Sequence, residues 1–285
     1  MYESYWQLDC RPFEPCAEAR FHYPCPAQHS ALLKLQYVVE QRRGAALLAG
    51  ESGVGKTWLI GRLLASLDEA YAPRVHLSYP QLACEQLVGW LADQLAGGLD
   101  PSATLAQHVR RIEQALRRHA EAGQHPVIVL DEAHLLRDRQ TLEAIRLLMN
   151  FDAQGQPLAT WLLVGHTSLV PMVQRLPALE ERLAVTCLLR RLTAEETAQY
   201  VLHRLSAAGC QRPIFDPAAL KTVFALTGGI PRRINRLCDL ALVVGYGEEL
   251  PLLKPEHLEA VHAELSGAAW PAAPPSPETQ PAGAV

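Results

Sequence analysis

The sequence predicts an α/β fold, in which helices flank a parallel β-sheet, followed by a smaller all-helical domain. Three observations predict it. An apolar run, a glycine-rich segment and a helical pattern follow one another between residues 45 and 67. Further short apolar runs alternate with helix-like stretches up to residue 189, which is typical of β-α units and a parallel sheet. After Leu192 the strand signals end and short helical patterns begin.

Each strand of the expected sheet is a short apolar run. The first is expected at 45–49, and the others at 75–77, 127–130, 161–164 and 185–189. One intervening helix is clear between 102 and 122, because its apolar residues share one face and Gly123 supplies a stop. The apolar residues of that face are Leu105, Val109, Ile112 and Leu116.

The helical domain has its own start signals. Thr193 with Glu196 forms a capping-box pattern, and Asp216 followed by Pro217 starts a second helix. Two more helices are expected, the third beginning around residue 230 and the fourth after residue 255. The stretch 267–285 is rich in Pro and Ala and nearly free of large apolar residues, so we expect a disordered tail there.

Composition narrows the class of protein. The 285 residues suffice for a large core and a smaller satellite, and the formal net charge of −4 argues against a surface that binds nucleic acid over its whole extent. Seven cysteines without a paired framework, no secretory signal and no bilayer-length apolar run favour a soluble, reduced, cytoplasmic protein without an intrinsic membrane segment. No paired zinc spacing occurs among Cys10, Cys16, Cys25, His22 and His29, so we expect no metal there.

The glycine-rich segment reads Gly50, Glu51, Ser52, Gly53, Val54, Gly55, Lys56 and Thr57. Its glycines allow consecutive backbone N–H groups to point at a phosphate, and the helix that follows adds the positive end of its dipole. This predicts a P-loop, or Walker A motif, that binds ATP together with Trp58, the next residue. Lys56 would reach the β and γ phosphates and the Thr57 hydroxyl would ligate Mg²⁺. The alternative, a glycine turn without a ligand, does not explain why a strand and a helix flank the segment.

A second motif follows the strand at 127–130, where Asp131 and Glu132 stand at the carboxyl end. Open α/β sheets bind ligands at these ends. We interpret the pair as a Walker B motif, in which Asp131 holds the metal and Glu132, by strand alternation, points the other way and acts as general base on the attacking water. Taken alone, two acids after an apolar run could simply mark the end of a strand.

Together the motifs resemble an AAA+ ATPase, and most closely the general secretion pathway protein A (ExeA-like) family. The resemblance covers residues 1 to about 265, and its narrowest mark is the stretch Gly228 to Asn235. The other segments that carry the resemblance are Pro12-Phe13, Arg20-Phe21, His29, Arg42-Arg43-Gly44, Leu142 to Phe151, Tyr200 to Leu205 and Leu237-Cys238-Asp239.

The resemblance implies roles for four further residues. Arg232 would be the sensor-2 arginine that touches the γ-phosphate and links nucleotide state to a lid. His166 stands at the sensor-1 position, where the family usually has glutamine, so either it or another group orients the water. Arg182 would be an arginine finger offered to a neighbouring subunit, with Arg175 as the reserve candidate. An exposed or ion-paired arginine remains the alternative for Arg182.

The resemblance also implies an organisation and a function. We expect active homo-oligomers, ring-like or filamentous, coupling ATP hydrolysis to assembly or remodelling of a secretion or cell-envelope complex. Members of the family commonly continue into a membrane-spanning helix and a peptidoglycan-binding region, whereas this sequence ends in its Pro-rich stretch. We therefore expect either that a partner supplies recruitment to the inner membrane or that the ATPase has been put to another use. The expected segments are 1–30, packing on the nucleotide site; 31–190, the P-loop AAA+ core; 191–266, the helical lid; and 267–285, the tail.

Two alternative functions remain open. The first is a DNA-associated regulatory ATPase, since transposition-accessory ATPases resemble the same core. The second is a non-hydrolysing, nucleotide-dependent scaffold. Three arginine pairs bear on the DNA alternative, although solvated helix surface is the better explanation of them: Arg42-Arg43, Arg117-Arg118 and Arg190-Arg191.

Overall fold

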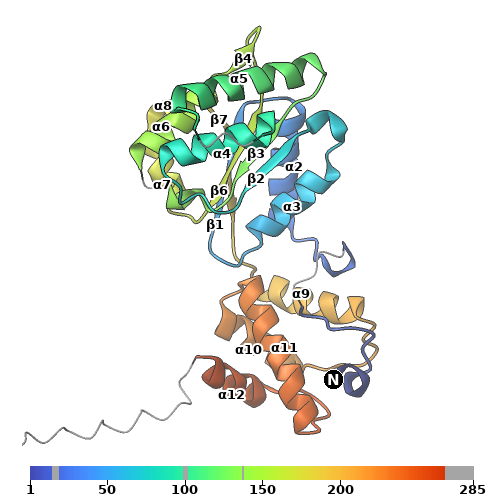
Figure 1. Ribbon diagram of the computed structural model, residues 1–285. Helices are drawn as coiled ribbons and strands as arrows, with labels where there is room; N and C mark the ends of the chain where they lie inside the picture. The colour runs from blue at the N-terminus through green and yellow to red at the C-terminus, as the bar shows by residue number, and fades with distance from the viewer. Residues whose placement is uncertain (15–18, 99–101, 137, 267–285) are drawn as a thin grey trace, which may run out of the picture. The chain divides into compact units, whose positions relative to one another are not determined.

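The computed structural model describes residues 1–14, 19–98, 102–136 and 138–266, so Cys16 and the predicted tail lie outside the described residues. The chain groups into two compact units (Figure 1). The sheet unit consists of His22–Leu192 with Ile230–Arg232. The helical unit consists of Met1–Phe21, Thr193–Gly229 and the described residues from Arg233 onward.

The sheet unit is built on five parallel strands in the order β2-β3-β6-β1-β7. Each strand overlaps an apolar run that the sequence marks, and the predicted α/β class with a parallel sheet is confirmed. The carboxyl ends of all five strands lie at one edge, because every pairing is parallel. The strands are β1 (Ala45–Gly50), β2 (Arg74–Leu77), β3 (Val127–Leu130), β6 (Thr160–Gly165) and β7 (Leu183–Leu189).

Helices cover both faces of this sheet, with α2 and α3 on one side and α4 and α5 on the other (Figure 1). Alternate residues of β1 divide between two apolar cores: Ala46 and Leu48 pack with α2 and α3, whereas Leu47 packs with the opposite layer. Strands buried on both faces need continuous apolar runs. The helices are α2 (Pro26–Glu40), α3 (Lys56–Ser66), α4 (Cys84–Ala96), α5 (Leu105–Glu121), α6 (Arg139–Leu148), α7 (Leu169–Gln174) and α8 (Pro177–Glu180).

Short elements complete the sheet unit. The strands β4 (Asp152–Ala153) and β5 (Gln156–Pro157) form an antiparallel pair. Two 3₁₀ turns, η2 (Glu69–Tyr71) and η3 (Ala133–Leu135), follow α3 and β3 respectively. The turn η3 matters for the site, because it begins directly after the acidic pair of residues 131 and 132.

Two helices of the helical unit begin at the residues that the sequence predicts. The Thr193 hydroxyl accepts a hydrogen bond from Glu196 N at 3.2 Å and Asp216 accepts one from Ala218 N at 2.7 Å, so both expected caps are confirmed. Its helices are α1 (Glu3–Trp6), η1 (Ala19–Phe21), α9 (Ala194–Ala207), α10 (Pro217–Thr227), α11 (Pro231–Gly247) and α12 (Pro255–Leu265).

The start of the chain forms part of this helical unit. The Trp6 side chain is fully buried and donates from Nε1 to the Leu242 carbonyl at 2.9 Å. The Tyr2 hydroxyl donates to Asp239 Oδ1 at 2.5 Å. The predicted segment 1–30 is therefore divided, since residues 1–21 group with the helical unit and residues 22–30 with the sheet unit.

Candidate functional site

The glycine-rich loop connects the end of β1 to the start of α3. Gly53 and Gly55 have φ values of 85° and 101°, a left-handed region that favours glycine. Gly53 also has no room for a side chain, because an added Cβ would lie 2.9 Å from the Arg232 Cβ. Val54, between the two glycines, is buried and anchors the loop to the core on the α2 and α3 face.

Lys56 opens α3 and points back into this loop. Its side chain is buried, and Nζ donates to the carbonyls of Gly50 at 3.0 Å and Glu51 at 2.9 Å. Burial lowers the pKa of Lys56 below its usual value, although the nearby Glu132 and Asp131 act in the opposite direction. The ammonium group is thus already desolvated and held by the carbonyls of the loop.

Asp131 and Thr57 meet at the carboxyl edge of the sheet. The Thr57 hydroxyl donates to Asp131 Oδ2 at 2.9 Å, and Glu132 N donates to Asp131 Oδ1 at 2.8 Å. Burial alone would raise the pKa of Asp131, which is 3% exposed, but His76 and these two hydrogen bonds lower it overall. The result is a carboxylate that stays ionised beside a hydroxyl.

His76, on β2, is a neighbour of Asp131 that the sequence did not indicate. Its Nε2 lies 3.6 Å from Asp131 Oδ2 and is buried without a hydrogen-bond partner among the described residues. Only the order of the strands in the sheet could have indicated this contact between His76 and Asp131. Because β2 is the direct neighbour of β3, with His76 opposite Val129, its side chain reaches the end of the acidic strand.

Glu132 is oriented by a left-handed turn rather than by the strand alternation that the sequence suggests. The strand β3 ends at Leu130, and Glu132 has φ 51° and ψ 32° at the start of η3. Its Oε2 lies 3.3 Å from His134 Nδ1, and the Glu132 side chain is 45% exposed. A non-glycine residue in this region is uncommon and is enriched at functional sites.

His166 follows the end of β6, next to β3. Its ring nitrogen Nδ1 accepts from Ser168 N at 3.4 Å, so the ring turns towards its own loop. Its backbone N–H instead donates to His134 Nδ1 at 3.2 Å. The group that His166 contributes to the Glu132 neighbourhood is therefore its main chain, and a catalytic role for its ring stays a prediction.

Arg232 belongs to the short stretch of α11 that groups with the sheet unit. Its backbone N–H donates to the Gly53 carbonyl at 3.2 Å, and its guanidinium donates from Nη1 to Ser52 Oγ at 3.5 Å. Arg232, which we expect at the γ-phosphate, thus contacts the glycine-rich loop that we expect to bind the phosphates.

Arg182 lies at the amino-terminal ends of the strands, opposite the edge that carries the phosphate loop. It directly precedes β7, whose first residue, Leu183, pairs with Ala45 at the start of β1, whereas the loop follows the end of β1. At about 3.3 Å per residue, the length of β7 separates Arg182 from that edge by about 20 Å. Arg182 and Arg175 are both exposed, and Arg182 does not lie at the Lys56 and Asp131 site of its own chain.

Trp58 stands one turn into α3 and stacks on the His22 ring, with centroids 4.3 Å apart and planes 19° apart. Gln28 Nε2, on α2, donates to the Val54 carbonyl at 3.4 Å. Residues just before and within α2 therefore contact the loop and the start of α3. The resemblance implies that the N-terminal segment packs on this site, but it does not identify His22 or Gln28 as the residues in contact.

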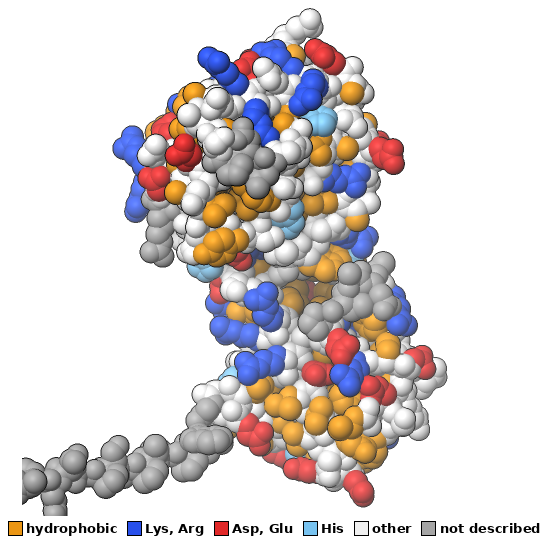
Figure 2. Space-filling view, in the orientation of Figure 1, with side chains coloured by type: hydrophobic (Ala, Val, Ile, Leu, Met, Phe, Trp, Pro, Cys, Tyr) orange, Lys and Arg blue, Asp and Glu red, His pale blue; other side chains and the backbone are white. Residues whose placement is uncertain are grey.

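The arginine pairs differ in their surroundings. Arg191 binds both carboxylate oxygens of Glu51, at 2.7 and 2.5 Å, and Arg117 donates to Glu113 at 2.9 Å. Arg43 lies over the Tyr37 ring. On the face seen in Figure 2, basic and acidic side chains are interspersed over the sheet unit. Because Arg191 and Arg117 are already ion-paired with glutamates, we interpret these pairs as solvated surface rather than as a surface that binds nucleic acid.

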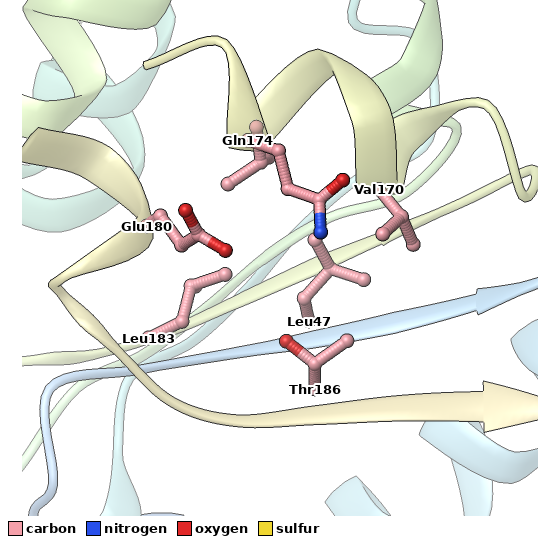
Figure 3. A pocket seen from close by; sticks show the side chains of 7 residues that line it. Leu47, Val170, Gln174, Glu180, Leu183 and Thr186 are labelled. Atoms are coloured by element: carbon pink, nitrogen blue, oxygen red, sulfur yellow. The ribbon is translucent and has the colours of Figure 1, made fainter. Parts of the chain in front are cut away.

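A separate cavity of about 220 Å³ lies between α7, α8 and the strands β1 and β7. Figure 3 shows the Gln174 amide and the Glu180 carboxylate above Leu47 and Thr186, with Leu183 and Val170 beside them. It opens over the middle of β1 and β7 rather than at their carboxyl ends. It therefore does not coincide with the phosphate loop.

The donors present fit Mg²⁺ as it occurs with nucleotides. A hydroxyl and one carboxylate are hard oxygen ligands, and Mg²⁺ in such sites takes one or two protein carboxylates and completes its shell with phosphates and water. Within the described residues no group of three His, Cys, Asp or Glu side chains could hold a metal ion by itself. No helix in the described part of the chain is long and apolar enough to cross a membrane.

Comparison with known proteins agrees with the motifs. Residues 39–173 match the family model of the AAA domain. The chain is 32% identical over 273 residues to General secretion pathway protein A of Aeromonas hydrophila, an alignment that covers 95% of this chain and 48% of that relative. The chain therefore spans about half the length of the curated relative it matches. The resemblance stated from the sequence is confirmed.

Solved structures share the fold. CDC6P from Pyrobaculum aerophilum superposes with a TM-score of 0.72 at 18% identity, covering 89% of this chain and 70% of that one. The Aeropyrum pernix ORC2 protein in its ADPNP-ADP complexes gives 0.65 at 14% identity, with coverages of 90% and 72%. The Aeropyrum pernix ORC1 protein in complex with DNA gives 0.64 at 18%, with coverages of 89% and 68%. At these identities the likeness shows the fold alone.

Proposed function

We propose that this chain, which is an AAA-domain protein, binds ATP with Mg²⁺ at residues 50–57 and hydrolyses it with Glu132 as general base. One observation carries the proposal. Thr57 and Asp131 come from segments 74 residues apart, yet their side chains share a 2.9 Å hydrogen bond at the carboxyl edge of the sheet. A hydroxyl and an ionised carboxylate in contact, beside a buried lysine, form the donor set that nucleotide hydrolysis requires.

Each residue has a defined part in the proposed reaction. The loop N–H groups hold the phosphates, and Lys56 exchanges its two carbonyl partners for β- and γ-phosphate oxygens. Thr57 and Asp131 would hold Mg²⁺, which when bound neutralises charge on those oxygens. Glu132, whose side chain is 45% exposed, can reach a water and take its proton as the water attacks. Arg232, beside Ser52, would complete the charge neutralisation.

The proposed cellular role is assembly or remodelling of a secretion or cell-envelope complex. Its support is the similarity to General secretion pathway protein A, about half of whose length this chain spans. We propose that residues 31–190 are the catalytic core and residues 191–266 the lid, and that the chain acts as a homo-oligomer. Self-assembly is part of the proposal because Arg182, about 20 Å from the carboxyl edge along β7, could serve a nucleotide only in a neighbouring copy.

The Glu132→Gln variant tests the chemistry. It should bind ATP as the wild type does, while turnover falls by about 10²-fold or more, because the general base is gone and the charge-binding groups remain. Glu259→Gln, on the exposed face of α12, is the matched control and should change neither quantity. Unchanged turnover in Glu132→Gln would remove that residue from the mechanism, and a wild type without ATP affinity would refute the proposal.

The same assay separates the alternatives. Turnover that rises with added DNA and declines steeply with salt would favour the DNA-associated ATPase. Wild-type protein that binds ATP without any turnover would favour the non-hydrolysing scaffold. Turnover indifferent to DNA, but dependent on protein concentration and abolished by Arg182→Ala, would support hydrolysis across a subunit interface.

A further inference from the structure

Two loops at the carboxyl edge of the sheet are joined through His134. The strands β3 and β6 are direct neighbours, with Leu130 opposite Leu163. The loop after β6 sends the His166 backbone N–H to His134 Nδ1 at 3.2 Å. Gly165 permits this approach, because a Cβ there would lie 3.1 Å from His134 N and 3.2 Å from its Nδ1.

The same nitrogen of His134 has a second neighbour. Glu132 Oε2 lies 3.3 Å from His134 Nδ1, the atom that also accepts from the His166 N–H. In a neutral imidazole each nitrogen either accepts or donates a hydrogen bond. His134 Nδ1 can therefore accept from the His166 N–H or donate to the Glu132 carboxylate, but it cannot do both.

We propose that His134 is a positioning residue that couples the loop after β6 to Glu132. While the His166 N–H donates to Nδ1, the His134 proton resides on Nε2 and Glu132 is not held, so its carboxylate is available to a water. When that loop withdraws, the proton moves through solvent to Nδ1, which then donates to Glu132 and holds it away.

The surroundings allow this exchange. The His134 side chain is 22% exposed and that of Glu132 45%, so solvent can carry the proton between the two ring nitrogens. The left-handed backbone at Glu132, with φ 51°, turns its side chain back over η3 towards His134. The tilted His134 and His166 rings, with centroids 5.8 Å apart, leave the backbone contact as the link between the loops.

Two substitutions of similar polarity test the proposal, which rests on hydrolysis as proposed above. In His134→Asn an amide atom occupies the position of Nδ1, whereas in His134→Gln the amide lies one bond further out, near that of Nε2. Gly165→Ala, which pushes the two loops apart, should lower kcat by about tenfold, equivalent to about 1.4 kcal/mol, with an unchanged Kd for ATP, because His134 then holds Glu132. Adding His134→Gln should restore kcat to within about twofold of the wild type, because its amide no longer reaches Glu132, whereas adding His134→Asn should not. Equal kcat values in the two double variants, or a rise in Kd that matches the fall in kcat, would overturn the proposal.

A second readout does not depend on turnover. Histidine-selective ¹⁵N NMR of the whole wild-type chain, with the His134 signals assigned by their loss in His134→Asn, reports which ring nitrogen is protonated. Without nucleotide, Nδ1 should be unprotonated, and Gly165→Ala, which pushes the two loops apart, should shift the proton to Nδ1. A proton on Nδ1 in both proteins would overturn the proposal whatever the turnover of the variants. By contrast, a wild type that shows this shift but no hydrolysis would refute only the proposed function.

Discussion

Gly53 and Gly61 offer two substitutions to alanine whose effects should have opposite signs. At Gly53 the backbone has φ 85°, and a new Cβ would lie 2.9 Å from Arg232 Cβ and 3.1 Å from Ile230 Cγ2. The left-handed conformation costs an alanine about 1–2 kcal/mol, and overpacking adds about 1–3 kcal/mol. Gly61 lies within α3 with nothing within 4 Å of the position of a Cβ, so alanine there should stabilise by about 0.5–1 kcal/mol.

The pair is measured by thermal unfolding of the sheet unit, followed by circular dichroism, and by ATP binding. Gly53→Ala should lower Tm by about 10 °C, at about 2–4 °C for each kcal/mol in a domain of this size. It should also weaken ATP affinity, because the strained loop has to shift. Gly61→Ala should raise Tm slightly and bind ATP normally. Two variants that change Tm in the same direction would refute the reasoning from φ and from contact distances.

Two further predictions concern pH and helix capping. Burial lowers the pKa of His125 from 6.5 to about 4, so the folded state favours the neutral ring. The contribution of this preference to the free energy of unfolding is fully present above pH 6.5. It declines as pH falls towards 4, by up to about 3 kcal/mol. Urea unfolding across this range should show the slope, and His125→Gln should flatten it; a wild type with no slope would contradict the cause. Thr193→Ala should destabilise the helical unit by about 1 kcal/mol, because the Thr193 hydroxyl accepts the Glu196 N–H. Thr222→Ala, at an exposed hydroxyl within α10, is the control for removing a hydroxyl without removing a cap.

The sequence predicts the sheet unit well because its signals are local. The run at 45–57 predicts strand, loop and helix. Its apolar residues, its three glycines and its lysine each determine the conformation of residues that are close to them in the sequence. The acidic pair at 131 and 132 is predicted for the same reason, because it follows an apolar strand directly. The contact of Thr57 with Asp131 confirms that both motifs share one edge.

The features that sequence reasoning missed depend on strand order and backbone turns. His76 lies beside Asp131 only because β2 neighbours β3, and parallel neighbours are not visible from one sequence. The direction of the Glu132 side chain was assigned from strand alternation, which ceases to apply because the strand ends at Leu130. His134 could have been noticed as a histidine two residues beyond an acidic strand end, but its contact with His166 requires the pairing of β3 with β6.

The placement of Trp6 against Leu242 has a consequence for biosynthesis. These two partners are separated by 236 residues, so the helical unit cannot close its core until Leu242 has left the ribosome. All five strands of the parallel sheet, by contrast, have been made by residue 189. Because domains generally fold as units during translation, the segment around Trp6 must wait, unburied, while the sheet unit folds. Until α11 is made, that waiting stretch with its exposed tryptophan is a natural target for chaperones.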